Sequence, residues 1–182
     1  MNTHLRQFRR FAQYNAWFNS RLYELISSLT EEERRREMGA FFRSIHGTLN
    51  HILLTDRMWL GRISKHPRGF QSLKTTPLVF EIESLAQVLY VRFPELATQR
   101  RETDTAIQSW VAELTPEILE GDLSYSRSTG QSMVAPFWHV VAHLFNHQTH
   151  HRGQVTTLLF QLGHDPGLTD FMATAFMAEG AA

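Results

Sequence analysis

The feature that most constrains the fold is a histidine-rich stretch over residues 138–154, WHVVAHLFNHQTHHRGQ. It holds five of the chain's ten histidines, contains no proline and has no glycine before Gly153. Its apolar residues recur at helical spacing, so the sequence predicts a helix. Because residues four apart lie on one face of a helix, four of the histidines form a row, with His150 beside it. The row consists of His139, His143, His147 and His151.

This row is too long to bind a single metal ion. Between His139 and His151 a helix rises about 18 Å, whereas a metal ion lies about 2.0–2.1 Å from a histidine nitrogen. An ion could therefore bind one i, i+4 pair, and the spacing leaves open which pair and which third ligand. A second helical pattern, SIHGTLNHILLTDRMW over residues 44–59, carries His46 and His51. These two lie about 140° apart around a helix, so one of them at most should face the same ion.

The strings HQTHHRGQV and TLNHILLTDRMW together resemble the DinB-like family of metal-binding four-helix-bundle proteins, the damage-inducible group unrelated to the translesion polymerase of similar name. The resemblance extends to YNAWFNSRL near the start and GHDPGLTDF near the end, so it covers nearly the whole chain. It implies one divalent ion held by three histidines, which at the matching positions are His51, His147 and His151. His143 stays open as a rival to His151, whereas His150 is expected to bond a neighbour or solvent.

Four long amphipathic patterns predict an all-α fold: a four-helix bundle with a long crossover loop between the second and third helices. The chain length suits a single domain over residues 1–182. The long helices are expected at Thr3–Leu29, Phe42–Ser64, Phe93–Leu114 and Pro136–Leu162. The smaller elements expected are a capping box at Thr30, short helices at Ser84–Tyr90 and Phe171–Met177, and a hairpin that pairs Ile118–Tyr125 with Gln131–Val134.

Composition excludes several classes of protein. Eighteen basic and 18 acidic residues give no net charge, which argues against a nucleic-acid partner. No run approaches the 18 or so apolar residues of a membrane span, and the N-terminus lacks the apolar run of a secretory signal. The absence of cysteine excludes disulfides, thiolate ligands and a cysteine nucleophile, and it fits a reducing compartment. A cytoplasmic protein is therefore expected.

Two other metal chemistries are disfavoured by the motifs. The string HQTHH imitates the HExxH pattern of zinc peptidases, but Gln148 replaces the glutamate that would act as general base. A di-iron carboxylate site needs Glu-x-x-His motifs, which the chain lacks. A ligating histidine usually donates its other N–H to a neighbouring group. The candidates for this role are Asn146, Gln154, Thr55 and Asp56.

For two charged residues near the motifs, the sequence allows two different roles. Asp56 lies five residues after His51, so it is poorly placed to bond that ring, and an ion pair with an arginine is at least as good an interpretation. Arg152 follows His151 directly. It could hold an anionic substrate or tie its helix to the preceding loop.

Three neutral imidazoles suit zinc or nickel, with iron, manganese and copper as alternatives. Three protein ligands leave an open position, as in catalytic sites. The resemblance implies a metal-dependent thiol S-transferase, or a related hydrolase or isomerase, acting on a small molecule. The metal would lower the pKa of an external low-molecular-weight thiol such as bacillithiol, mycothiol or glutathione. The alternatives are a stress-related metal-binding protein without turnover and an interaction module with a structural metal.

The first predicted helix carries more aromatic residues than one core-facing side needs. They are Phe8, Phe11, Tyr14, Trp17 and Phe18. Together they cover more than the ~100° stripe that faces a core. A second copy of the chain, or the loop between helices two and three, must cover the excess. Two-fold homo-oligomers are the commonest assemblies and the resemblance also implies dimers, so a homodimer is expected.

Overall fold

The computed structural model describes residues 3–127 and 129–176. Within these residues the fold is mainly helical, with one small antiparallel sheet. The helices are α1 (Thr3–Ser27), α2 (Glu31–Arg35), α3 (Ile45–Ile63), α4 (Phe93–Ala112), α5 (Pro116–Glu120) and α6 (Phe137–Gln161), with 3₁₀ helices η1 (Gln71–Leu73) and η2 (Phe171–Phe176). The strands are β1 (Asp122–Ser126) and β2 (Ser132–Pro136). The expectation of an all-α chain is therefore confirmed in outline.

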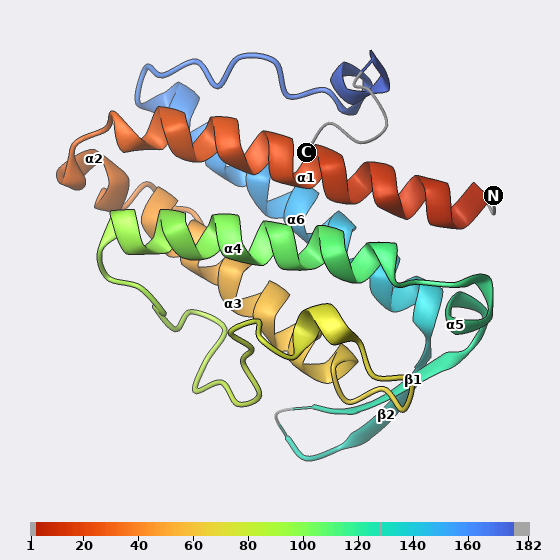
Figure 1. The fold of residues 1–182 in the computed structure, drawn as a ribbon. Coiled ribbons are helices and arrows are strands. Elements are labelled where there is room, and N and C mark those ends of the chain that lie inside the picture. Colours follow the sequence, from red (N-terminus) through yellow and green to blue (C-terminus); the bar gives the residue numbers. More distant parts are fainter. Residues whose placement is uncertain (1–2, 128, 177–182) are drawn as a thin grey trace.

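The four long helices form two packed pairs. Helix α1 lies beside α4, and α3 lies beside α6, with further contacts from α1 to α6 and from α3 to α4 (Figure 1). Two apolar clusters fill the interior, one toward each end of these helices. Between the clusters, each long helix contributes buried polar side chains. These include Asn15 and Asn19 of α1, His51 and Asp56 of α3, Arg100 and Asp104 of α4, and Gln148, His151 and Arg152 of α6. The polar residues are thus concentrated in a central layer.

The start of α3 differs from the sequence-based expectation, because the helix begins at Ile45 and not at Phe42. Arg43 adopts a left-handed backbone conformation with φ of 69°, which turns the chain before the helix. The Ser44 side chain then caps the helix by accepting a hydrogen bond from the Gly47 amide at 3.1 Å. Phe42 consequently lies outside the helix, where its ring can pack against the helix face.

The expected short helix over Ser84–Tyr90 is wrong. The connection between α3 and α4 contains no α-helix, and η1 is its only regular element. The Asn50 side chain of α3 hydrogen-bonds both backbone groups of Tyr90. The Asn50 side-chain oxygen accepts from the Tyr90 amide at 2.9 Å, and the Asn50 side-chain nitrogen donates to the Tyr90 carbonyl at 3.2 Å. The segment therefore follows α3 as turns and bends, including a hydrogen-bonded turn from Ser84 to Gln87, and forms no helix.

The hairpin exists, but its first strand begins later than expected. Ile118 lies in α5, which starts with Pro116 and is capped by Thr115. The two strands pair Asp122 with Pro136 at one end and Ser126 with Ser132 at the other. The expected capping box at Thr30 is confirmed, since Thr30 and Glu33 satisfy each other's backbone amides.

The C-terminal segment covers part of the aromatic surface of α1. The rings of Phe11 and Tyr14 each lie 5.3 Å from that of Phe171, and the Tyr14 hydroxyl donates to the Thr169 carbonyl at 2.6 Å. Neither of the two expected covering elements accounts for these contacts. The last expected helix is the 3₁₀ helix η2, and Met177 lies outside the described residues. The homodimer stays a prediction.

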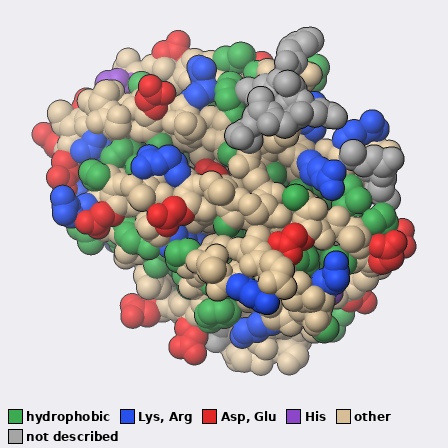
Figure 2. All heavy atoms as spheres, viewed as in Figure 1, with side chains coloured by type: hydrophobic (Ala, Val, Ile, Leu, Met, Phe, Trp, Pro, Cys, Tyr) green, Lys and Arg blue, Asp and Glu red, His purple; other side chains and the backbone are tan. Residues whose placement is uncertain are grey.

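In the part of the chain that the structure describes, no helix is long and apolar enough to cross a bilayer. On the face drawn in Figure 2, acidic and basic side chains are interspersed. This pattern agrees with the equal numbers of acidic and basic residues in the sequence.

Candidate metal centre

Three histidines from two helices converge within the central polar layer. His51 comes from α3, and His147 and His151 come from successive turns of α6. The Nε2 atom of His147 lies 3.2 Å from that of His51 and 3.1 Å from that of His151. Each ring offers one nitrogen to a common point, and these ligand atoms all lie within 4.8 Å of one another. The packing of α3 against α6 therefore brings together the three histidines that the resemblance implies.

Hydrogen bonds at the outer nitrogens orient two of these rings. His51 donates from Nδ1 to the Leu85 carbonyl at 2.8 Å, because a carbonyl oxygen can only accept. His151 donates from Nδ1 to the Gln154 side-chain oxygen, also at 2.8 Å. Both Nε2 atoms therefore carry a lone pair. This arrangement is typical of histidines that bind a metal, whose second nitrogen is bonded to a neighbouring group.

The third ring completes the same pattern. Nδ1 of His147 lies 3.4 Å from the Thr55 hydroxyl oxygen, and that hydroxyl donates its own hydrogen to the His51 carbonyl at 2.8 Å. Thr55 can then only accept from His147, which leaves the His147 Nε2 atom with a lone pair as well. Three lone pairs meeting at 3.1–3.2 Å repel one another unless a cation lies between them. In a tetrahedral site with bonds of about 2.0–2.1 Å, ligand nitrogens lie about 3.3 Å apart, so the set fits a metal ion.

Burial keeps the three rings neutral. It lowers the pKa of His51 to about 4, a shift that the Leu85 carbonyl partly opposes. Burial also lowers the pKa of His147 to about 3, and the neighbouring histidines lower it further. The pKa of His151 is likewise lowered by burial, against the opposing hydrogen bond to Gln154. A neutral imidazole is the form that binds a metal ion.

These pKa shifts predict that metal affinity falls less steeply than for ordinary histidines as the pH drops from about 7.5 to 5.5. Protons compete with a metal only near the pKa of the folded ligand, and these pKa values lie below the ordinary histidine value of about 6.5. Ordinary histidines would lose about tenfold in affinity per ligand for each pH unit below 6.5. Competition titrations against a chelator at several pH values would measure the slope. A tenfold loss per ligand between pH 6.5 and 5.5 would contradict the burial argument.

An open apolar cleft leads to the three histidines. It has a volume of about 500 Å³. Its apolar lining consists of Phe41, Phe42, Met58, Trp59 and Leu85. Phe42 stacks on the His51 ring with centroids 3.7 Å apart, so the turn before α3 forms one wall of the site. A ligand of the metal can therefore approach from solvent along an apolar surface.

The remaining histidines of the two motifs lie outside the converging set. His143, the rival to His151, is exposed, packs on Trp59 at 5.2 Å and lines the cleft. His150 is exposed, and its Nε2 atom accepts from the Gln154 amide nitrogen at 3.3 Å. His46 binds the Tyr90 carbonyl through Nε2 at 2.9 Å, which gives it a structural role.

Asp56 is not a partner of the metal ligands. It is buried, and the Arg100 guanidinium bonds its carboxylate at 2.5 Å, so the ion-pair interpretation of Asp56 is the correct one. Arg100 also pairs with Asp104 at 2.8 Å.

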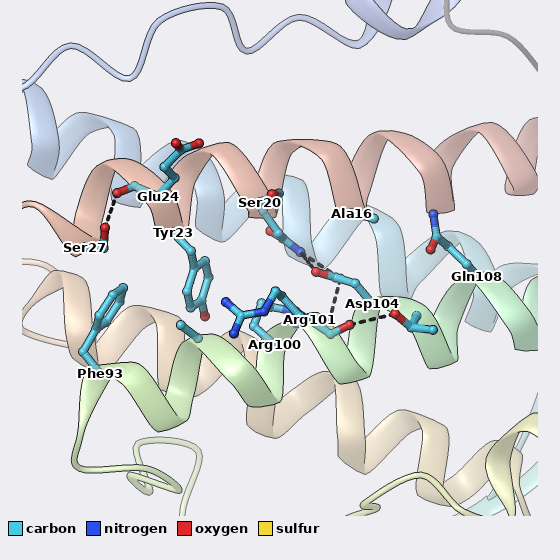
Figure 3. Close-up of a pocket in the computed structure, with 13 residues that line it drawn as sticks. Ala16, Ser20, Tyr23, Glu24, Ser27, Phe93, Arg100, Arg101, Asp104 and Gln108 are labelled. Carbon is cyan, nitrogen blue, oxygen red and sulfur yellow. Dashed lines mark hydrogen bonds and ion pairs between the residues drawn. The ribbon is translucent and has the colours of Figure 1, made fainter. Parts of the chain in front are cut away.

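Arg100 and Asp104 line a separate cavity of about 510 Å³ between α1 and α4, where the Tyr23 ring points toward α4 (Figure 3). No histidine is among the described residues that line this cavity.

Arg152 ties its helix to α1 and not to the preceding loop, and it does not line the cleft at the three histidines. It is buried against the rings of Tyr14 and Phe18, and its guanidinium bonds the side-chain oxygens of Asn15 and Gln148. It therefore ties α6 to α1 on the side of the helix away from the cleft. Asn146 also lies on this other side, in a cavity with Tyr14 and Asn15. Of the four expected histidine partners, Gln154 and Thr55 contact the ligand rings, and Asn146 and Asp56 do not.

The Leu85 carbonyl is a site group that sequence reasoning missed. A backbone carbonyl carries no side-chain signal, and the short helix expected over Ser84–Tyr90 would have used this carbonyl internally. Phe42 was also missed as a wall of the site, because the second long helix was expected to begin at this residue. The FF pair at residues 41–42, directly before the Ser44 cap, is the signal that could have indicated an apolar rim.

Comparison with known proteins gives one consistent result. The family model of the DinB family matches residues 1–181. A curated relative, Protein DinB of Bacillus subtilis (strain 168), is 26% identical over 175 residues, which covers 92% of this chain and 92% of that protein. The match thus extends over both motifs that carry the three histidines.

Proposed function

The chain belongs to the DinB family, and from this premise we propose that it is a four-helix-bundle protein that binds one divalent ion through His51, His147 and His151. We further propose that it acts as a metal-dependent S-transferase, or a related hydrolase or isomerase, with an external low-molecular-weight thiol. The observation that carries the proposal is the convergence of three imidazole lone pairs beside an open apolar cleft.

The composition of the ligand set guides the choice of metal. Three neutral nitrogen donors without a carboxylate suit zinc or nickel, with iron, copper and manganese as weaker alternatives. Magnesium and calcium prefer oxygen ligands and fit poorly. With three protein ligands, a small molecule can take the open position.

The residues around the site support thiol transfer in distinct ways. When bound, the ion would take the sulfur of the thiol as a ligand and lower its pKa, which supplies a thiolate nucleophile. Phe41, Phe42 and Leu85 line the cleft beside this position and offer an apolar surface to the electrophile. In the transfer, a sulfur–carbon bond forms and the leaving group departs with the electron pair of the bond that breaks. The thiol proton passes to solvent through the mouth of the cleft.

A second candidate function is metal binding without turnover, in a stress-related or interaction role. The observation that favours it concerns proton transfer. Among the described residues that line the cleft there is no carboxylate, so no acidic side chain is placed to act as a general acid or base. Reactions that need a carboxylate here are therefore disfavoured, whereas metal storage and thiol transfer are compatible with the lining, in which His143 and His150 are the groups outside the ligand set that can move a proton.

A conjugation assay separates the two functions. Metal-loaded protein is mixed with an electrophilic dye and, in turn, bacillithiol, mycothiol or glutathione. We expect product formation above the uncatalysed rate with at least one thiol, and its loss in His147→Ala, because that variant lacks the central ligand. Binding of one metal ion per chain without acceleration by any of the thiols would favour the second function.

A further inference from the structure

A second cleft lies next to that of the metal centre, farther along α3. It has a volume of about 650 Å³ and lies between α3, residues 79–82 and the β1–β2 hairpin. Four charged residues line it: Arg62, Lys65 and Arg127, which are basic, and Glu81, which is acidic. The cleft therefore carries an excess of positive charge, although the whole chain has none.

In the described part of the chain, the three basic side chains lack acidic partners. Within residues 3–127 and 129–176, none of Arg62, Lys65 and Arg127 forms an ion pair, and the Arg62 guanidinium donates no hydrogen bond to a protein acceptor. Some other surface arginines are paired: Arg35 with Glu31 and Arg92 with Glu95. Five N–H groups of Arg62 are thus available to a ligand.

Aromatic rings hold Arg62 and Lys65 in place. The Arg62 guanidinium carbon lies 4.5 Å from the Trp59 ring centroid and 5.0 Å from that of Tyr125. The Lys65 ammonium lies 5.2 Å from the Phe80 ring. A stacked guanidinium keeps its N–H edge free for a planar carboxylate. Burial lowers the pKa of Arg62, and the positive charge of Arg127 lowers it further. The two positive charges repel each other, and a bound anion would reduce this repulsion.

The two clefts are neighbours along α3. Met58 lines both clefts, and the Trp59 ring packs on His143 of the first cleft and on Arg62 of the second. The α3 residues that face the two clefts follow one stripe of the helix, at spacings of four, three and four residues. They are His51, Thr55, Met58 and Arg62. From His51 to Arg62 the helix rises about 16 Å, a distance that a molecule of short-peptide length can bridge.

We propose that this basic cleft binds the carboxylate end of the small thiol whose sulfur lies at the metal centre. The inference rests on the proposed function and adds the class of thiol: one that carries carboxylates at a distance from its sulfur. Arg62 is the central specificity-determining residue, because its free edge can bind a carboxylate through two hydrogen bonds. Lys65 and Arg127 add positive charge at the exposed rim.

Cobalt-loaded protein provides the test. Glutathione carries two carboxylates, whereas its diethyl ester carries the same thiol without them, and thiolate binding to cobalt is followed by its charge-transfer absorption. We expect the wild type to bind glutathione at least about tenfold more tightly than the ester, with a difference that shrinks at high salt. In Arg62→Gln, glutathione should lose about tenfold in affinity while the ester is unchanged. An unchanged ester affinity also shows that the metal centre of the variant is intact.

Arg101→Gln is the matched control, because Arg101 is an exposed arginine of α4 without an ion pair in the described residues. Neither thiol should change its affinity in this variant. Equal affinities of the wild type for glutathione and its ester, or an unchanged ratio in Arg62→Gln, would overturn the inference and leave the proposed function standing. If neither thiol altered the cobalt spectrum, the thiol function would fail instead. S-methylglutathione has no free thiol, so calorimetry with it would then test the basic cleft alone. Equal affinities of the wild type and Arg62→Gln for this molecule would also overturn the inference.

Discussion

Replacing His147 with alanine is expected to abolish tight binding of a divalent ion. The Nε2 atom of His147 lies 3.2 Å from that of His51 and 3.1 Å from that of His151, so it is the ligand that links the two helices. Losing a residue that merely bonds a ligand costs about 10–100-fold in metal affinity, and losing a ligand itself should cost more. His51→Ala and His151→Ala should have the same direction of effect. Competition with a chromophoric chelator would measure the affinities.

His150→Ala is the matched control for His151→Ala. The two rings are neighbours on α6, with centroids 4.7 Å apart, but His150 is exposed and does not belong to the converging set. Its removal should leave the affinity within about twofold, since surface substitutions change little. Circular dichroism would show that each variant keeps its helices. Equal loss in His150→Ala, with none in His151→Ala, would overturn the assignment of the ligands.

The second large effect concerns stability and comes from Arg100. Its guanidinium lies between Asp56 and Asp104, and all three side chains are buried. Arg100→Leu would leave two buried carboxylates without a cation between them. Removing one partner of a buried ion pair typically costs about 3–5 kcal/mol. We expect a loss of this size in the free energy of unfolding at neutral pH, measured by denaturant titration of the metal-free protein.

The pH dependence of this variant gives a second readout. Burial already raises the pKa of Asp56 to about 6, an effect that Arg100 opposes. Without Arg100 the folded pKa should rise further, so the folded state would bind more protons than the unfolded state. Stability of Arg100→Leu should therefore recover as pH falls below neutral. Arg101→Leu, one residue along on the exposed face, is the control and should change stability by less than about 0.5 kcal/mol. Similar losses in both variants would show that the ion pairs contribute little.

The sequence predicts the long helices and the placement of His147 and His151 on one helix face, because both depend on local periodicity. An i, i+4 pair such as His147 and His151 shares a face in any helix. The match to a known family added His51, which periodicity alone could not separate from His46. The extent of α3 was harder to predict, because the turn at Arg43 depends on a left-handed backbone conformation for which the sequence offers no glycine.

The central polar layer was not predicted, although the sequence carries a signal for it. Asn15 and Asn19 lie four residues apart on the buried face of α1, and Arg100 and Asp104 have the same spacing on α4. Polar residues at apolar positions indicate a buried network when they recur on several helices. Their partners could not be deduced, because pairs such as Arg100 with Asp56 join helices whose relative register only the packed structure defines.

The most direct test of the metal centre is metal analysis of protein purified from its native host without metal-affinity resin, combined with X-ray absorption at the edge of the metal found. The proposed site predicts one zinc, nickel or related divalent ion per chain, with three imidazole nitrogens at about 2.0–2.1 Å. Two results would contradict it. One is a protein that is purified without a transition metal and takes up none when the metal is added. The other is a metal whose ligands are carboxylate oxygens.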